Sequence, residues 1–273
     1  MNPLGEGQTS LSKEAIVIEQ RNLPAYDAGA IDVPFVIGFF QERVQVDTCW
    51  PSHSHPTHEL LWNQQGVSSV SVGPRTWTIT PVLGVWVPAG VLHEGTARAA
   101  SVCNMSHFGI TSVDSIAEEP VPVVITPLLR LLLERLADPE LTPKSRAITE
   151  AAAIDNLQPA PGCLAVHVPQ SDLLQPIVRE SIGRPGPARS LQQWADRLGV
   201  SGRTISRAFQ AETGIGYSRW AGSLHAQQAM EMVAQGEDLQ DIAQLLGFSS
   251  QSSLGAAFRR NTGFTLSSFR GTK

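Results

Sequence analysis

The spacing of apolar residues changes along the chain and divides it into regions. In the first part, apolar and polar residues alternate over short stretches, as at Val70-Ser71-Val72, and this alternation is typical of strands. Later, apolar residues recur every three or four positions, which is typical of amphipathic helices. The pattern predicts an α+β protein of two domains. We expect an N-terminal tail (1–30), an antiparallel β-barrel (31–115), helices that dimerise or pack (116–170), a helix and linker (171–190) and an all-α domain (191–273).

The all-α region contains one pattern written twice. Residues 191–214 reappear as 239–263, offset by 48 residues in the first half and by 49 from the phenylalanine onward. Each copy has an apolar helical stripe, then a glycine (Gly199 or Gly247), a serine and a second apolar stripe. The glycine tolerates a tight helix exit, and the serine hydroxyl can cap the next helix. The repeat predicts two helix-turn-helix units, joined by a longer helix over 217–235.

The second helix of each unit has a polar, basic outer face. Its inward positions are apolar, which leaves the other side free to enter a DNA major groove. The residues expected to contact DNA are Ser201, Arg203, Thr204, Ser206, Arg207, Gln210, Ser250, Gln251, Ser252, Arg259 and Arg260. Residues 184–273 hold ten Lys or Arg against six Asp or Glu, whereas the preceding residues hold ten against nineteen. A basic domain favours DNA, although solvated arginines on an ordinary all-α domain are the alternative.

At these residues the segment resembles the AraC/XylS family of bacterial transcription regulators. The matching positions include Ser201-x-Arg203, Arg207-x-Phe209, Gly214, Trp220, Ala229, Ile242-Ala243-x3-Gly247-Phe248-Ser249 and Phe258-Arg259-Arg260. The resemblance implies a protein that binds double-stranded DNA at promoters or operators, with RNA polymerase as a further partner if it activates transcription. The departures are His225, Leu254, Ala256 and Leu266. Because Ala256 stands where the family often has Arg, we expect the first unit to dominate specificity.

Four of the seven histidines fall between residues 53 and 93. His53, His55 and Glu59 are all odd-numbered, so on an extended strand they would share one face, provided that Pro56 does not break the register. With His93 from another strand, they could enclose a divalent ion. This ligand mix suits Zn, Fe, Mn, Ni or Co and does not choose between them.

The same residues resemble the two cupin motifs, His-x-His-x3-Glu-x6-Gly and Pro-x-Gly-x2-His. They are matched by His53, His55, Glu59 and Gly66, and by Pro88, Gly90 and His93. The resemblance implies a jelly-roll-like barrel in which His53, His55, Glu59 and His93 bind metal. In a degenerate cupin the same positions line an organic-ligand pocket instead, and both alternatives stay open. We expect Trp62, Trp77 and His107 in the effector pocket, and His58 at the rim.

A leucine-rich stretch over 124–137 follows the barrel, a second helical pattern follows over 145–157, and a short strand is expected over 164–168. In the family, helices at this place pair two subunits. The resemblance therefore implies a homodimer, for which the apolar face offers Leu128, Leu129, Leu132 and Leu136. Packing of both helices on their own barrel is the alternative.

Composition excludes several other classes of protein. A hydrophobic content of 42% and a charged content of 16% are those of an ordinary globular chain. The sequence lacks a run of eighteen apolar residues and a signal-peptide pattern, which predicts a cytoplasmic protein without a membrane partner. The cysteines, Cys49, Cys103 and Cys163, are odd in number and widely spaced, which argues against a disulfide framework or zinc finger.

Together these features predict a transcription regulator controlled by a small molecule or metal ion in the barrel, without catalytic residues or enzyme activity. A metal-dependent cupin enzyme of the dioxygenase or isomerase type, carrying a helical tail, is the alternative. A protein-interaction module is a third possibility, and the basic balance of the last third gives it no support.

Overall fold

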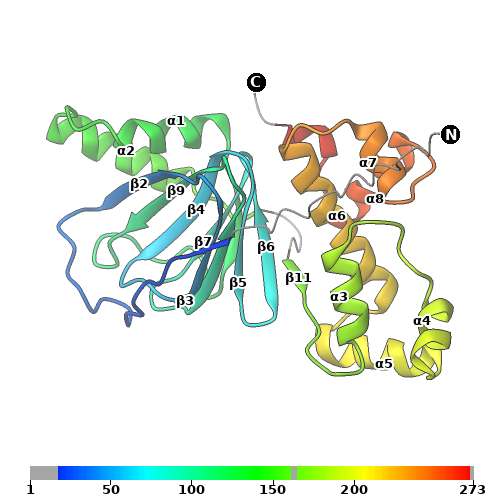
Figure 1. The fold of residues 1–273 in the computed structure, drawn as a ribbon. Coiled ribbons are helices and arrows are strands. Elements are labelled where there is room, and N and C mark those ends of the chain that lie inside the picture. Colours follow the sequence, from blue (N-terminus) through cyan, green and yellow to red (C-terminus); the bar gives the residue numbers. More distant parts are fainter. Residues whose placement is uncertain (1–17, 161–164, 271–273) are drawn as a thin grey trace, which may run out of the picture.

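The computed structural model describes residues 18–160 and 165–270, so Cys163 and most of the expected tail lie outside it. Within these residues two sheets pack face to face and are followed by a helical domain (Figure 1). Sheet A runs in the spatial order β1 (Ile18–Gln20), β3 (Asp47–His53), β8 (His93–Ala97), β5 (Ser68–Val72), β6 (Arg75–Ile79) and β11 (Ala165–His167). Sheet B runs β10 (Val121–Val124), β7 (Leu83–Val87), β4 (His58–Gln65), β9 (Val102–Phe108) and β2 (Ile37–Arg43).

The strands of the barrel span more of the chain than the predicted range, 31–115. Strand β1 lies in the segment expected to be a tail and pairs in parallel with β3. Strand β10 lies in the segment expected to be helical and pairs with β7 at the edge of sheet B. Strand β11 confirms the short strand predicted over 164–168 and pairs with β6 at the edge of sheet A. These strands are short, and β10 includes Pro122, which an edge strand tolerates. Edge pairing of this kind comes from tertiary contacts that local alternation does not encode.

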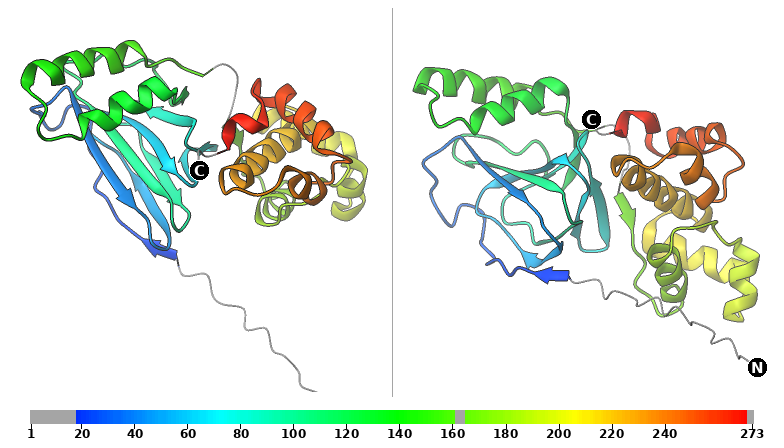
Figure 2. Two further views of the ribbon diagram at one scale, coloured as in Figure 1. Left: turned by 90° about the horizontal axis from the view of Figure 1, so that it is seen from above. Right: turned by 45° about the horizontal axis from the view of Figure 1, so that its top comes forward.

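Helices α1 (Pro127–Leu136) and α2 (Pro143–Asp155) pack on sheet B (Figure 2). Thr126 and Thr142 cap them, and each helix begins with a proline, which suits the first helical position. Leu129 and Leu136 are buried in a core shared with Trp62 and Trp86. Assigning these two leucines to a subunit interface was wrong, because they already fill the core of their own barrel.

The helical domain comprises α3 (Gln175–Gly183), α4 (Leu191–Leu198), α5 (Gly202–Thr213), α6 (Tyr217–Ala234), α7 (Leu239–Leu245), α8 (Gln251–Thr262) and a 3-10 helix (Leu266–Phe269). The predicted helix-turn-helix units are confirmed as α4–α5 and α7–α8, joined by α6. Gly199 and Gly247 have the positive φ angles, 67° and 80°, that the tight turns require. No helix in the described part of the chain is both long and apolar enough to cross a membrane.

The helical domain sits beside sheet A, with β6 and β11 nearest to it (Figure 1). Apolar and polar contacts join the helical domain to the barrel. One apolar cluster contains Leu83 and Ala160 of the barrel together with Met230 and Phe258 of the helical domain. The indole Nε1 of Trp220 also donates to the carbonyl oxygen of His167, at 2.6 Å. The two domains therefore share both a core and hydrogen bonds.

Candidate functional sites

A cavity of about 350 Å³ lies between the two sheets. Strand alternation turns one set of side chains inward, because Glu59 stands opposite His107 and Leu61 opposite Met105 in the β4–β9 register. The walls also include Phe40 of β2, Trp50 of β3 and Ile79 of β6. At the mouth, the guanidinium of Arg21 lies over the Trp50 ring and is paired with Glu42. The cavity therefore combines aromatic and aliphatic walls with polar side chains, among which the histidines and Glu59 form one cluster.

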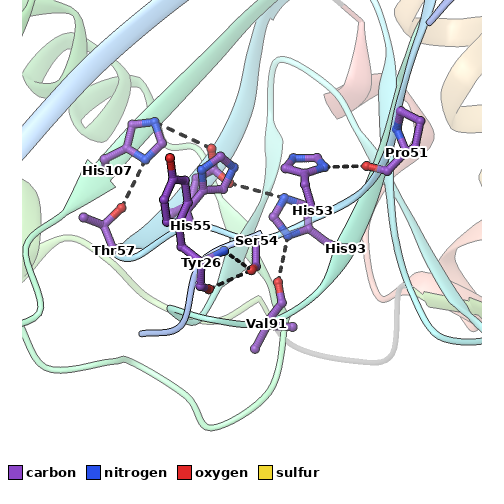
Figure 3. Close-up of polar contacts among 10 residues, drawn as sticks. Tyr26, Pro51, His53, Ser54, His55, Thr57, Val91, His93 and His107 are labelled. Carbon is purple, nitrogen blue, oxygen red and sulfur yellow. Dashed lines mark hydrogen bonds and ion pairs between the residues drawn. The ribbon is translucent and has the colours of Figure 1, made fainter. Parts of the chain in front are cut away.

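Three imidazoles converge in this cluster, as Figure 3 shows. One potential ligand atom from each of His53, His55 and His93 lies within 4.8 Å of the others. The Oε2 atom of Glu59 is 3.5 Å from Nε2 of His55 and 3.6 Å from Nε2 of His93. Ligand atoms around one transition-metal ion are separated by roughly 3 to 3.5 Å when each bond is about 2.1 Å long. The structure therefore brings all four predicted ligands together.

Alternation along a single strand does not explain why the four predicted ligands converge. His53 is the last residue of β3 and pairs with His93 after a register shift in the ladder. His55 lies in the connection before β4, which begins at His58. The chain turns between His53 and Glu59, so these residues come from two different sheets. The interpretation that they share one extended strand was wrong, although their proximity was predicted.

Backbone carbonyl groups hold two of the rings in place. Nδ1 of His53 is 2.7 Å from the carbonyl oxygen of Pro51, and Nδ1 of His93 is 3.0 Å from that of Val91. A carbonyl oxygen only accepts a hydrogen bond, so each Nδ1 carries a proton, and Nε2 is the ring nitrogen left to face a ligand. Outer partners of this kind orient the histidine ligands of metal ions.

Two buried acceptors in this cluster have no hydrogen-bond partner among the described residues. They are Oε2 of Glu59 and Nε2 of His93, which face each other. Two lone pairs at this distance repel unless a cation or a proton lies near them. The donor set, its convergence and its unpartnered atoms therefore fit a divalent metal ion. A proton on Glu59 is the other way to satisfy the pair.

Burial also controls the protonation of the cluster. Burial, with the neighbouring imidazoles, lowers the pKa of His55 to about 3, and burial lowers the pKa of His93 to about 4. Burial raises the pKa of Glu59 to about 8. The imidazoles of His55 and His93 are therefore neutral near pH 7, which is the form that binds metal ions.

The other residues predicted for the pocket have different environments. His107 borders the cavity, with Nε2 3.8 Å from Oε1 of Glu59 and Nδ1 3.2 Å from Oγ1 of Thr57. Trp62 also borders it, but its indole belongs to the core under α1 and donates to Ser106. Trp77 is wrong as a pocket residue, because it is buried in a separate core with Val70 and Val85.

His58 lies outside the cluster, although it is close in sequence. Its Nδ1 accepts from the backbone N–H of Ala89 at 3.0 Å, and its ring lies 5.4 Å from that of Trp86. It is half-buried on the other face of β4 from Glu59. His58 therefore provides a natural control for the cavity histidines.

The predicted DNA-binding residues divide into two groups. Ser201 and Ser250 cap α5 and α8, Thr204 bonds to Ser201, and Gln210 donates to the carbonyl oxygen of Gly214. These side chains are engaged in holding the helices. The remaining side chains make no hydrogen bond or ion pair within residues 18–160 and 165–270, and all but the half-buried Ser206 are exposed: Arg203, Ser206, Arg207, Gln251, Ser252, Arg259 and Arg260. They are the groups free to reach a duplex.

A β-sandwich with a histidine-lined cavity, followed by two helix-turn-helix units, defines a DNA-binding regulator with a ligand-binding domain. Two family models match the chain. One is described as "AraC-like ligand binding domain" and matches residues 38–157; the other, "Helix-turn-helix domain", matches residues 194–272. Together they cover most of the barrel, helices α1 and α2, and nearly all of both DNA-binding units. The chain belongs to the AraC family of transcriptional regulators.

Named relatives are transcriptional regulators as well. The chain is 27% identical over 223 residues to the HTH-type transcriptional regulator NimR of Escherichia coli K12, covering 79% of this chain and 80% of that protein. It is 34% identical over 103 residues to the HTH-type regulator RipA of Corynebacterium diphtheriae, covering 38% and 31%. Among solved structures, ToxT from Vibrio cholerae matches with 9% identity, coverage of 85% and 95%, and a TM-score of 0.34. The DNA-binding domain of AdpA in complex with a target DNA matches with 26% identity, coverage of 37% and 91%, and a TM-score of 0.34.

Proposed function

We propose that this regulator is controlled by a small molecule or metal ion bound in the cavity between its sheets. The convergence of three imidazoles and Glu59, on the same chain as two helix-turn-helix units, carries this proposal. Occupancy of the cavity then changes how the protein binds promoter or operator DNA in the cytoplasm. If the effect is activation, RNA polymerase becomes a further partner.

The metal would be held by His53, His55, Glu59 and His93, with His107 beside them. Zinc, iron, manganese, nickel and cobalt all accept this mixture of nitrogen and oxygen ligands. When bound, the ion supplies a Lewis-acidic centre in the cavity. The protein residues orient the ligands and exclude water around them, because the cluster is buried and its outer carbonyl partners hold the rings.

The cavity walls favour an effector with an apolar body and one electron-pair donor. Phe40, Trp50 and Met105 offer apolar surface, and the cluster offers polar groups. Among the described residues that line the cavity, Arg21 is the one guanidinium or ammonium group, and it is already paired with Glu19 and Glu42. These lining residues therefore offer no free cation to recognise an acid. An electron-pair donor would bind at the metal or accept a hydrogen bond from Nδ2 of Asn104, which has no hydrogen-bond partner among the described residues.

Metal analysis with two matched histidine variants tests the metal site. The wild-type chain, dialysed against Zn²⁺ or Co²⁺, should retain about one equivalent. His55→Ala should lower the affinity by about tenfold to a hundredfold or more, because removing one outer partner alone costs about that much in such sites. His58→Ala, which removes a histidine outside the cluster, should bind like the wild type. Absence of metal from the wild-type chain, or equal binding by both variants, would contradict the metal site and leave an organic-ligand pocket.

We further propose that the chain acts by binding and not by turnover. A sensor joined to a DNA-binding domain needs only occupancy, and the regulator family supports this role. The metal-dependent cupin enzyme remains the competing function. Release of a transformed product, when the metal-loaded chain is incubated with a compound that it binds, would favour the enzyme.

A homodimer formed through α1 and α2 completes the proposal. These helices expose Leu128, Leu131 and Ile148, which are 54%, 58% and 61% exposed. Leu132 is half-buried beside them. Side chains of this size are normally covered, and a second copy of the same face is the simplest cover for a regulator with paired DNA sites.

Charge placed on that face should separate the subunits. Leu131→Glu should elute and scatter light as a monomer at micromolar concentration, whereas the wild type forms a dimer. Leu92→Glu is the control, because Leu92 is 55% exposed in the loop between β7 and β8 and belongs to neither helix. A monomeric wild type, or a Leu131→Glu variant that stays dimeric, would contradict this interface.

A further inference from the structure

Strand β6 touches both the cavity and the DNA-binding domain. Ile79 on its inner face borders the cavity, and Thr78 on its outer face donates from Oγ1 to Oε1 of Glu231 in α6, at 3.2 Å. Successive side chains on a strand point to opposite faces, so one backbone segment positions both groups. We propose that this pair of residues transmits the state of the cavity to the DNA-binding domain. The transmission step rests on the proposed sensor role of the cavity.

Helix α6 has a second attachment to the same edge of the sheet. Trp220 donates to the carbonyl oxygen of His167 in β11, and β11 pairs with β6. Trp220 and Glu231 are about three helical turns apart, so both point to the same side of α6. A displacement of β6 therefore acts on α6 at two places, one near each helix-turn-helix unit.

Several hydroxyl groups on the outer face of sheet A are hydrogen-bonded to each other. The hydroxyl groups of Ser69 and Thr96 bond to each other at 2.7 Å, and those of Ser71 and Thr76 at 2.8 Å. These outward groups are satisfied within the sheet and do not need α6. A crevice of about 290 Å³, bordered by Ser69, Thr96 and Glu231, separates this part of the sheet from the helix.

Glu231 is the group that depends on the docked arrangement. Burial raises the pKa of its carboxyl, and Thr78 is the hydroxyl that bonds to it. A partly buried carboxyl that loses its donor is destabilised more than an exposed one. The apolar contact between Leu83 and the helical domain keeps the domains together, so the contact between Thr78 and Glu231 sets how α6 lies on the sheet.

Hydrogen–deuterium exchange on the full chain tests the contact itself. Thr78→Val keeps the shape of the side chain and removes the hydroxyl, so peptides covering β11 and α6 should exchange about fivefold faster. Ser71→Ala removes a hydroxyl from the same face that does not contact α6, and should match the wild type. Thr78→Ser should restore slow exchange, which separates loss of the hydroxyl from misfolding. Wild-type exchange in Thr78→Val, or fast exchange in Thr78→Ser, would overturn the proposal.

Two cavity-filling variants test the transmission. Ile79→Phe and Leu61→Phe both place a ring in the cavity, but Leu61 belongs to β4 in sheet B and not to β6. Only Ile79→Phe should speed exchange in β11 and α6. Equal effects of the two variants, or none from Ile79→Phe, would overturn transmission through β6. Zinc binding is measured on the same variants, so a failure of the metal site is seen separately from a failure of transmission.

Discussion

The two helix-turn-helix units share one sequence pattern but have different neighbours. The first unit, α4–α5, is fixed by polar contacts to the segment that precedes it: Trp194 donates to the hydroxyl of Tyr217, which donates to the carbonyl oxygen of Arg189. Glu212 accepts the backbone N–H groups of Gln170 and Ser171. These contacts fix the first unit on the chain that links it to the barrel.

Each unit also shares an apolar core with a different barrel strand. The first unit packs with Val166 of β11, and the second, α7–α8, packs with Leu83 of β7. Leu246 and Phe258 belong to one cluster with Leu83 at the start of β7. The recognition helix of the second unit also has Gly255 and Ala256 on the outer side, where the first unit presents Ser206 and Arg207. A duplicated pattern therefore predicts two similar folds but not two equal roles. We expect the first unit to read sequence and the second to add affinity.

The largest expected difference concerns the arginines of α5. Arg207→Ala should weaken binding to the specific operator by about 1–3 kcal/mol, because an arginine that contacts guanine contributes that much discrimination. Fluorescence anisotropy at a fixed salt concentration measures the change. An unchanged operator affinity would show that α5 does not read the sequence.

A second difference concerns the two turn glycines. Gly199 has φ of 67° and no atom within 4 Å of the place that a Cβ would take, so Gly199→Ala should cost about 1–2 kcal/mol of stability from the backbone alone. At Gly247, φ is 80° and a Cβ would lie 2.7 Å from Cβ of Pro187 in the linker, so Gly247→Ala should cost more. Urea unfolding of both variants measures the order. Equal losses of unfolding free energy would show that Pro187 moves aside without destabilising the protein.

The smallest effect is expected from the second recognition helix. Arg259→Ala should lower the affinity for operator and unrelated DNA by a similar factor, about tenfold or less, and should reduce the salt slope by about one. Titrations on both DNAs over a range of salt concentrations measure these quantities. A loss confined to the operator would mean that Arg259 reads bases.

Local signals predicted the parts of the fold that depend on local chemistry. The glycine and serine of each turn, and the apolar stripes around them, were sufficient for α4, α5, α7 and α8, because caps and helix exits are short-range features. Strands β1 and β10 were missed, since each is short and gains its hydrogen bonds from a sheet edge formed elsewhere in the sequence. Which leucines of α1 are buried and which are exposed depends on the side of the helix that packs on the barrel, and the helical pattern alone did not predict this.

The candidate site shows the same limit. The four cavity ligands could be predicted from their spacing and motif, but not the turn that places His55 between two sheets. Trp77 was misassigned, because alternation gives the face of a strand and not which part of the interior it reaches. The contact between Thr78 and Glu231 joins residues 153 positions apart, and no local pattern marks it.

A base-by-base affinity profile of the operator tests the unequal roles of the two units most directly. Each operator position is substituted singly, and binding is measured for the wild type, Arg207→Ala and Gln251→Ala. The account predicts losses of about 1–3 kcal/mol per position in the half-site that Arg207→Ala relaxes, and smaller losses in the other half-site. The contradicting result would be that substitutions in both half-sites cause equal losses of affinity. In that result, Gln251→Ala would also reduce the base preference of one half-site as strongly as Arg207→Ala reduces that of the other.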